Sequence, residues 1–286
     1  MAYMDKIIES TIKKLETVAI DPYPTLNPTL GVIYQADDAA AGSYLRSIAR
    51  NAEKYKSTTI SAQCDTIQDA SLQIRKWSQD PNVNGIILIS DYGEATQSLY
   101  NLIPMRLDID GLSNKSAAHL YGSKDPIAYR KAPCTAVACL KIIQTLYDNN
   151  LAGLNVAVVG RSMRVGRPLA ELLLQQDCTV TLYHSKSEFI STEGMNNFSD
   201  KDVFVSAIGQ PKYFNTYNLD AFRLNIIDVG ISYNEQGHIC GDVDYDSVKD
   251  LADYITPVPN GVGAVTNTVL FAKLYANKLD FAGIDV

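Results

Sequence analysis

The feature that most constrains the fold is a short apolar run that ends in a glycine and continues into a helix-like segment, Asn155-Val-Ala-Val-Val-Gly160-Arg-Ser-Met-Arg-Val-Gly166-Arg-Pro168. The β-branched run Val156 to Val159 predicts a strand that is covered on both faces. Gly160 allows a sharp turn at the carboxyl end of this strand, and a helix starting near Val165 would aim free backbone N–H groups at the turn. Gly166 removes a Cβ where helix and strand must pack closely. The segment therefore predicts a strand, a turn and a helix that together attract phosphate.

The glycine spacing departs from the dinucleotide-binding pattern G-x-G-x-x-G, because Ser162 occupies the middle position. On this motif alone, an ordinary strand-turn-helix of an α/β protein is an equal alternative. The next predicted strand is followed by His184-Ser185-Lys186, where a cofactor with a free ribose hydroxyl usually meets an Asp or Glu. Together with Arg161 and Arg164, these hydroxyl and basic groups favour the 2′-phosphate of NADP over NAD. The alternative is that they are solvated loop residues.

Composition sets broad limits on the class of protein. The chain has 286 residues, which leaves room for two modest domains, and its 46% apolar and 20% charged residues are ordinary for a globular protein. The net charge of -7 argues against a general nucleic-acid or anionic-membrane partner. The five scattered cysteines and three histidines form no C-x-x-C pair or ligand spacing, so no disulfide framework or metal site is predicted. The first residues lack an apolar signal core, which predicts a cytoplasmic protein.

Strands alternate with helices along both halves of the chain. In the first half we expect strands at 30–34, 57–63 and 85–90 and helices at 4–18, 37–56, 69–78 and 95–102. In the second half we expect helices at 136–149, 165–175 and 266–277, strands at 156–159, 179–183, 202–208 and 225–229, and a rigid extended segment at 254–263. Residues 108–129 are predicted to be irregular. The alternation predicts open parallel α/β sheets, whose ligands bind beyond the strand carboxyl ends.

Five further segments complete a recognisable pattern: Ile227-Asp-Val-Gly-Ile231, Gly241-Asp-Val243, Ile255-Thr-Pro-Val-Pro-Asn-Gly-Val-Gly263, Asp108-Ile-Asp110-Gly111 and Pro133-Cys134-Thr135. With the Gly160 segment, they resemble the methylenetetrahydrofolate dehydrogenase/cyclohydrolase family over nearly the whole chain. The resemblance implies two α/β domains with a folate cleft between them. Residues 1–145 plus 267–286 would form the folate-binding catalytic domain, and residues 146–266 a Rossmann-like NAD(P)-binding domain. It also implies a homodimer formed through the cofactor domains.

The resemblance assigns roles to individual residues. Tyr44 matches the tyrosine that stacks on the aminobenzoyl ring of folate, and Asp110 matches the aspartate that holds the pterin, so these two are the predicted catalytic residues. A packed helix tyrosine is the alternative for Tyr44. The predicted substrate-binding residues are Tyr44, Asp110, Pro259, Gly261 and Gly263. The predicted contacts to NADP are Gly160, Arg161, Ser162, Ser185 and Ile231.

Two departures from the family pattern bear on the chemistry. The family has a lysine four residues after the tyrosine, on the same helix face, and here that position is Ile48. The family has Gln-Leu-Pro where this chain has Ile89-Ser90-Asp91, so the glutamine position is Ile89. Asp91 is a candidate replacement for the missing polar groups.

These departures affect the two family reactions differently. Hydride transfer from 5,10-methylenetetrahydrofolate to NADP needs mainly positioning of two rings. Hydrolysis of methenyltetrahydrofolate needs general acid–base groups, which the lysine and glutamine would supply. The sequence therefore predicts an NADP-dependent methylenetetrahydrofolate dehydrogenase with little cyclohydrolase activity. The alternatives are a bifunctional enzyme that uses another acid–base group, and a folate- or nucleotide-binding protein that has lost catalysis.

Overall fold

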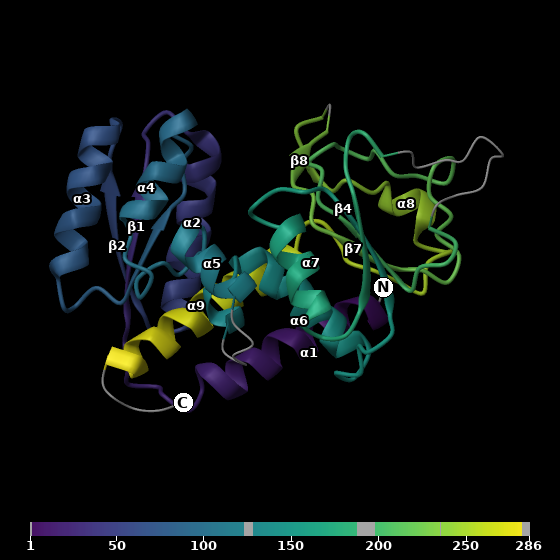
Figure 1. Cartoon of the computed structure of the whole chain (residues 1–286), viewed down its shortest axis with the longest axis horizontal. Coiled ribbons are helices and arrows are strands. Elements are labelled where there is room, and N and C mark those ends of the chain that lie inside the picture. Colours follow the sequence, from purple (N-terminus) through teal and green to yellow (C-terminus); the bar gives the residue numbers. More distant parts are fainter. Residues whose placement is uncertain (1, 123–127, 188–197, 235, 282–286) are drawn as a thin grey trace. The chain divides into compact units, whose positions relative to one another are not determined.

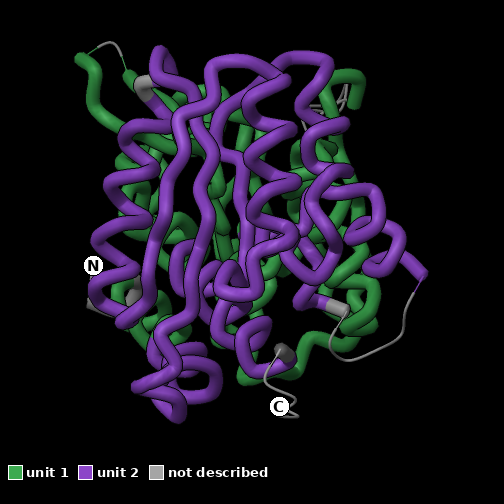
Figure 2. Tube along the Cα trace, turned by 90° about the vertical axis from the view of Figure 1, so that its left-hand side faces the viewer, with its two compact units in different colours: residues 1–12, 135–266 green, residues 13–134, 267–286 purple. Residues whose placement is uncertain are grey.

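The computed structural model describes residues 2–122, 128–187, 198–234 and 236–281 (Figure 1). The chain divides into two compact units, coloured separately in Figure 2. Unit 1 comprises Met1–Ile12 and Thr135–Thr266, and unit 2 comprises Lys13–Cys134 and Asn267–Val286. Compared with the domains expected from the sequence, residues 1–12 and 135–145 belong to unit 1. Residues 282–286 of the expected first domain lie outside the described residues.

Unit 1 is built on a parallel sheet of five strands. The strands are β4 (Asn155–Val159), β5 (Thr179–Tyr183), β6 (Val203–Ser206), β7 (Asn225–Asp228) and β10 (Tyr254–Ile255), in the order β10-β7-β6-β4-β5. The four strands expected in the second half are thus confirmed. The segment expected to be extended over 254–263 is so only at its start, because β10 ends at Ile255, residues 258–260 form a turn and a helix begins at Val262. The chain moves from β4 to one side for β5 and to the other side for β6, so the strand order reverses at β4. Such a switch point is where ligands bind in open α/β sheets.

Short elements complete unit 1. The helices are α6 (Cys134–Leu146), α7 (Gly166–Leu174) and the one-turn α8 (Tyr245–Val248), and β8 (Ser232–Tyr233) pairs with β9 (Ile239–Cys240) as an antiparallel hairpin. The sequence analysis did not predict α8 or the hairpin, because segments of two to four residues are too short to show a hydrophobic period. The core under the sheet includes Phe198, Phe204 and Phe214, which meet edge to face with ring centroids 4.8 and 4.9 Å apart.

Unit 2 contains a three-stranded parallel sheet, with β1 (Thr29–Tyr34) between β2 (Thr58–Gln63) and β3 (Gly85–Leu88). Its helical segments are α2 (Ala39–Lys54), α3 (Ile67–Gln79), η1 (Gly93–Ala95), α4 (Thr96–Leu102), α5 (Asn114–Gly122) and η2 (Ala128–Lys131). The three strands and the helices at α2, α3 and α4 confirm the sequence analysis. Helix α5 corrects it, because the analysis expected residues 108–129 to be irregular. A glycine is required at Gly31, since an added Cβ would lie 2.6 Å from the ring of Trp77 on α3.

Two long helices each contribute residues to both units. Helix α1 (Ala2–Ala19) crosses the unit boundary after Ile12, and α9 (Val262–Phe281) crosses it after Thr266. Both helices were predicted, although α9 begins four residues earlier than the sequence analysis expected. In the described ranges, no helix is long and apolar enough to cross a membrane.

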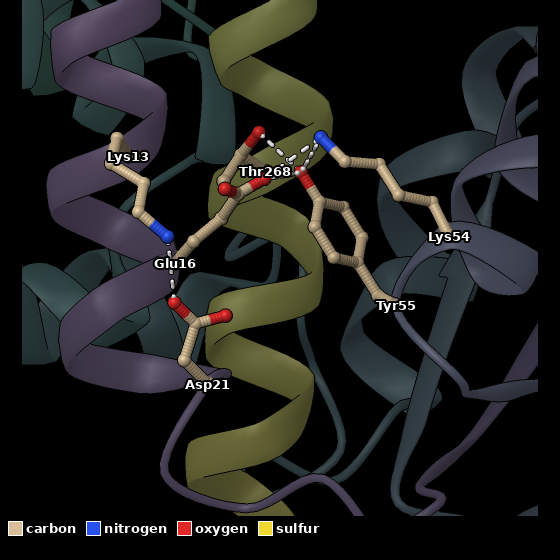
Figure 3. A network of polar contacts seen from close by, with 6 residues as sticks. All are labelled: Lys13, Glu16, Asp21, Lys54, Tyr55 and Thr268. Atoms are coloured by element: carbon tan, nitrogen blue, oxygen red, sulfur yellow. Dashed lines mark hydrogen bonds and ion pairs between the residues drawn. The ribbon is translucent and has the colours of Figure 1, made fainter.

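Within unit 2, a polar network joins α1, the end of α2 and α9 (Figure 3). The buried hydroxyl of Tyr55 lies 2.9 Å from Thr268 Oγ1 and donates to Glu16 Oε1 at 3.0 Å. Lys54 Nζ pairs with the same Glu16 oxygen at 2.8 Å. A second ion pair at the same helix, Lys13 to Asp21, is exposed to solvent. The inner part of the network satisfies buried polar groups of three helices at once.

Candidate active site

The turn after β4 has the close packing that the sequence predicts. Gly160 has a φ of 117°, and an added Cβ there would lie 2.2 Å from the carbonyl oxygen of Ala207 after β6. An added Cβ on Gly166, the first residue of α7, would lie only 1.7 Å from the carbonyl oxygen of Gly160. Both glycines therefore allow backbone-to-backbone contacts that side chains would block. The start of α7 lies directly against the turn at the switch point of the sheet.

The residues of this turn leave polar groups at the surface. Arg161, Ser162 and Arg164 are exposed, and the Ser162 hydroxyl oxygen accepts a hydrogen bond from Val165 N at 3.1 Å. That bond satisfies one N–H group ahead of α7. Exposed guanidinium groups beside a helix start form a basic environment that suits a phosphate-bearing ligand.

The end of β5 carries hydroxyl and basic side chains. Ser185 and Lys186 are exposed, and His184 Nδ1 accepts a hydrogen bond from Lys186 N at 3.1 Å. Strands β5 and β4 pair in parallel, with Tyr183 opposite Val159. These residues therefore leave the sheet at the same edge as Gly160, the edge that the carboxyl ends of the strands form. The structure thus brings Gly160, Arg161, Ser162 and Ser185 to one edge of unit 1. Ile231, which follows β7, comes to the same edge and is exposed.

Two buried carboxylates fix the loops at this edge, and the sequence analysis gave them no role. Asp242 accepts hydrogen bonds from Ser206 Oγ, Ile208 N and Gln210 N, each at 2.8 Å. Asp228 accepts from the backbone N–H groups of Gly230, Asp242 and Val243 at 2.9 to 3.0 Å. Burial, with a smaller contribution from neighbouring Asp242, raises the pKa of Asp228 to about 7.

Glycines accompany these two carboxylates. An added Cβ would lie 2.3 Å from an Asp242 oxygen at Gly230 and 1.9 Å from an Asp228 oxygen at Gly241. The motifs Ile227–Ile231 and Gly241–Val243 therefore interlock, each aspartate packing against the glycine of the other motif. This arrangement holds the loops after β6 and β7 in place.

The helix position that the family pattern gives to lysine is apolar core in this protein. Tyr44 and Ile48 both lie on α2, where Tyr44 is partly exposed and Ile48 is fully buried. At the end of β3, Ile89 is partly exposed, and buried Ser90 accepts a hydrogen bond from Gln35 N at 2.9 Å. That bond ties the end of β3 to the end of β1.

Asp91 has a local structural task. Its Oδ1 accepts hydrogen bonds from Gly93 N at 2.9 Å and Thr96 Oγ1 at 2.6 Å, at the start of η1 and α4. Such contacts are typical of a turn and a helix start. They explain the polar residue here without a catalytic task.

Asp110 lies in a tightly held loop of unit 2. Neighbouring Asp108 is 2% exposed and accepts from Gly111 N, Leu112 N, Ser113 N and Ser116 Oγ at 2.7 to 3.2 Å. These bonds organise the start of α5, which explains the helix that the sequence analysis missed. Asp110 itself is partly exposed and lies on this tightly held loop.

The segment Pro259 to Gly263 lies in unit 1, after β10 and at the start of α9. The Val258–Pro259 peptide bond is cis, and Asn260 has a φ of 74°. An added Cβ on buried Gly261 would lie 2.2 Å from the carbonyl oxygen of Pro257, so a glycine is required there. Gly263 has open space around it. The predicted substrate-binding residues are thus Tyr44 and Asp110 in unit 2 and these three in unit 1.

Unit 1 also contains a cavity of about 400 Å³ beyond the ends of β7 and β10. Its lining includes Lys212, Asp228, Cys240 and Thr256, and none of the residues predicted for cofactor or substrate. It is therefore separate from the Gly160 turn. Among the described residues, no cluster of His, Cys, Asp or Glu side chains could hold a metal ion.

Known proteins with similar sequence and fold exist. Residues 133–280 match the family model described as tetrahydrofolate dehydrogenase/cyclohydrolase, NAD(P)-binding domain. A bifunctional protein FolD from Methanoculleus marisnigri is 36% identical over 264 residues, covering 90% of this chain and 90% of the relative.

Solved structures agree with the sequence comparisons. The bifunctional 5,10-methylenetetrahydrofolate dehydrogenase/cyclohydrolase from Thermoplasma acidophilum has a TM-score of 0.81 at 26% identity, with 97% of each chain covered. A 5,10-methylenetetrahydrofolate dehydrogenase from the silkworm Bombyx mori has a TM-score of 0.82 at 25% identity, covering 98% of this chain and 97% of that one.

The five-stranded parallel sheet, its switch point at Gly160 and the matching family model define unit 1 as an NAD(P)-binding domain of the doubly wound α/β class. The FolD relative covers 90% of this chain, so the family assignment extends beyond this domain. The protein belongs to the tetrahydrofolate dehydrogenase/cyclohydrolase family, as its sequence motifs predict, and is an enzyme.

Proposed function

We propose that this protein is an NADP-dependent 5,10-methylenetetrahydrofolate dehydrogenase that lacks the cyclohydrolase reaction. The observation that carries the proposal is the full burial of Ile48 one helical turn from Tyr44. An apolar side chain there can neither activate water nor transfer a proton. Ile89 supplies no polar group either, and the Asp91 carboxylate accepts from the turn that starts η1 and α4.

The dehydrogenase reaction makes smaller demands on side chains. The nitrogen lone pairs of the folate expel the hydride, so the protein has to position the two rings rather than move a proton. In our proposal Asp110 accepts hydrogen bonds from the pterin, Tyr44 stacks on the aminobenzoyl ring, and the backbone at Pro259, Gly261 and Gly263 lines the substrate.

The edge of unit 1 fits a dinucleotide. Gly160 and Gly166 leave space for close backbone approach, and the start of α7 suits a pyrophosphate. The exposed Arg161, Arg164, Ser185 and Lys186 support the 2′-phosphate of NADP. NADP, when bound, supplies the acceptor for the hydride. Ser162 and Ile231 complete the proposed contacts.

One assay separates the proposal from its alternatives. Purified protein is incubated with 5,10-methylenetetrahydrofolate and NADP, and absorbance is read before and after an acid quench to distinguish NADPH from methenyltetrahydrofolate. We expect equal yields of the two products, and decay of added methenyltetrahydrofolate no faster than in buffer. Faster decay would show a bifunctional enzyme and overturn the loss of hydrolysis. No reduced cofactor with either NADP or NAD would point to a binding protein without catalysis.

Cofactor choice has a matched pair of variants. Arg161→Ala should raise the KM for NADP at least tenfold and the KM for NAD much less, because a charge-assisted bond to the extra phosphate is lost. Arg167→Ala is the control, since Arg167 is also exposed but its guanidinium donates to Met163 Sδ in the turn ahead of α7. Equal effects of Arg161→Ala on both cofactors would overturn the assigned role of Arg161.

Assembly and location are further parts of the proposal. The hairpin β8–β9 exposes Tyr233 and Ile239, and exposed apolar side chains on unit 1 support a homodimer formed through this unit. Light scattering coupled to gel filtration would give the mass directly, and a monomer at micromolar concentration would overturn the dimer. All five cysteines are buried and unpaired, which suits a reducing cytoplasm.

A further inference from the structure

Helix α9 carries a buried lysine that the proposed reaction does not use. Lys273 is 5% exposed, and its Nζ donates hydrogen bonds to the carbonyl oxygens of Ile109, at 3.2 Å, and Ala132. The Ile109 oxygen also accepts from Cys134 Sγ at 3.3 Å. Burying an ammonium group is costly, and an apolar side chain of similar size would usually stabilise a core at least as well. A lysine at this position therefore points to a task beyond packing.

The two carbonyl groups belong to backbone segments that touch each other. An added Cβ on Gly111, whose φ is 70°, would lie 2.3 Å from the Lys131 oxygen and 2.7 Å from the Ala132 oxygen. The loop at 108–111 and the segment at 131–134 thus pack backbone against backbone. Lys273 bonds to both segments where they meet, so its ammonium group connects them.

Asp110 lies between Ile109 and Gly111, and both of these neighbours are held by hydrogen bonds. On one side, the Ile109 carbonyl is held by Lys273, and the Ile109 side chain fills the space that a Cβ on Gly85 of β3 would need, 2.2 Å away. On the other side, Gly111 N donates to Asp108 Oδ1 at 2.9 Å. Both peptide groups that set the direction of the Asp110 side chain are therefore fixed.

We propose that Lys273 is a positioning residue that aims the Asp110 carboxylate at the pterin of the folate substrate. This role rests on the proposed function, in which Asp110 binds the pterin. Lys273 acts through the Ile109 and Ala132 carbonyl groups and does not touch the substrate. Preorganisation of this kind lowers the cost of binding, because the loop needs no ordering when the ligand arrives.

The test compares variants at two positions of the same helix. Lys273→Met removes the ammonium group and keeps the length of the side chain. Tyr275→Phe is the matched control, because the Tyr275 hydroxyl is equally buried and donates to the Tyr55 carbonyl oxygen at 2.6 Å, away from the Asp110 loop. KM and kcat are measured for 5,10-methylenetetrahydrofolate and for NADP, together with the melting temperature of each variant.

We expect Lys273→Met to raise the KM for the folate at least tenfold and to leave the KM for NADP within twofold of wild type. Tyr275→Phe should leave both KM values within twofold of wild type, even if its melting temperature falls as far as that of Lys273→Met. In a double-mutant cycle with Asp110→Asn, the double variant should be no worse than the poorer single variant, because both changes remove the same contact. A folate KM within twofold for Lys273→Met, or multiplying effects in the cycle, would overturn the proposal.

Two measurements keep the test decisive when activity or folding fails. Amide hydrogen exchange reports the loop directly, and Lys273→Met should speed exchange at residues 108–113 while Tyr275→Phe should not. Unchanged exchange at these residues would overturn the positioning role, whether or not the wild-type protein is an active dehydrogenase. A lack of dehydrogenase activity in the wild-type protein would contradict only the proposed function. If Lys273→Met does not fold, Lys273→Gln keeps an N–H donor without the charge. It should show the same changes to a smaller extent, and wild-type values for both KM and exchange would count against the proposal.

Discussion

Ile48 follows Tyr44 by one turn of α2, and the two side chains share a helix face although Ile48 is fully buried and Tyr44 is partly exposed. The boundary between apolar core and accessible surface therefore runs between these two residues. Tyr44 can meet a ligand while Ile48 belongs to the packing of unit 2. This placement separates a residue suited to binding from one that cannot take part in proton transfer.

Introducing the family lysine at this position should destabilise the protein. Ile48→Lys places an ammonium group among apolar side chains, and we expect a loss of several kcal/mol in the free energy of unfolding. Ile48→Leu conserves volume and polarity and should cost less than about 1.5 kcal/mol. Urea unfolding of the three proteins, followed by circular dichroism, measures both effects. Similar stabilities for Ile48→Lys and the wild type would mean that the site accepts a charge, and would weaken the argument against hydrolysis.

The contact between Gly166 and Gly160 gives a second prediction. In Gly166→Ala the new methyl group would overlap the Gly160 carbonyl oxygen, 1.7 Å away, so α7 must shift from the turn. We expect a loss of about 1–3 kcal/mol in stability, as in other overpacked sites. The KM for NADP should rise at least tenfold, because the helix start is displaced from the phosphates.

Gly122→Ala is the control for this change, because an added Cβ at Gly122 meets no atom within 4 Å. It should leave the KM for NADP and the unfolding midpoint near their wild-type values. If Gly166→Ala matched this control, the close packing of α7 on the turn would not be needed for cofactor binding.

The sequence predicted those parts of the fold and site that depend on neighbouring residues. The strand, the turn and the start of the helix around Gly160 lie within the fourteen consecutive positions 155–168, so their pattern is visible without the fold. The pairing of Asp228 with residues 242 and 243, and of Lys273 with residues 109 and 132, spans long stretches of chain. Nothing local marks such contacts. Helix α5 was missed for a different reason, since its start is organised by a side chain outside the helix, the Asp108 carboxylate, which accepts hydrogen bonds from Ser113 N and Ser116 Oγ.

The buried Asp228 should make stability depend on pH. Its pKa rises from 3.8 to about 7 on folding, so the folded protein holds a proton that the unfolded chain releases at lower pH. The resulting stabilisation is fully present below the unfolded pKa and is lost as pH rises through about 7. The free energy of unfolding should therefore fall between about pH 4 and about pH 7, by up to about 1.4 kcal/mol per pH unit for one proton, and should level off above about pH 7.

Variants identify the group responsible. Asp228→Asn should lower stability at every pH, because an amide replaces one acceptor oxygen with a donor, but the decline with pH should become shallower. Asp220→Asn, an exposed carboxylate of the same unit, should keep the wild-type slope. Urea unfolding at four or five pH values gives the slopes, and an unchanged slope in Asp228→Asn would assign the titration to another group.

The network around Tyr55 gives the last prediction. Tyr55→Phe removes the hydroxyl that bonds to Glu16 and Thr268 inside unit 2 and leaves the ring in place against Phe271, 5.3 Å away (Figure 3). Because both partners lose a bond in a buried setting, we expect a loss of about 1–3 kcal/mol in the free energy of unfolding. Lys13→Ala, in the exposed pair with Asp21, should leave the unfolding midpoint unchanged, since solvent screens that pair. Equal effects of the two substitutions in urea unfolding would show that burial does not set the strength of this network.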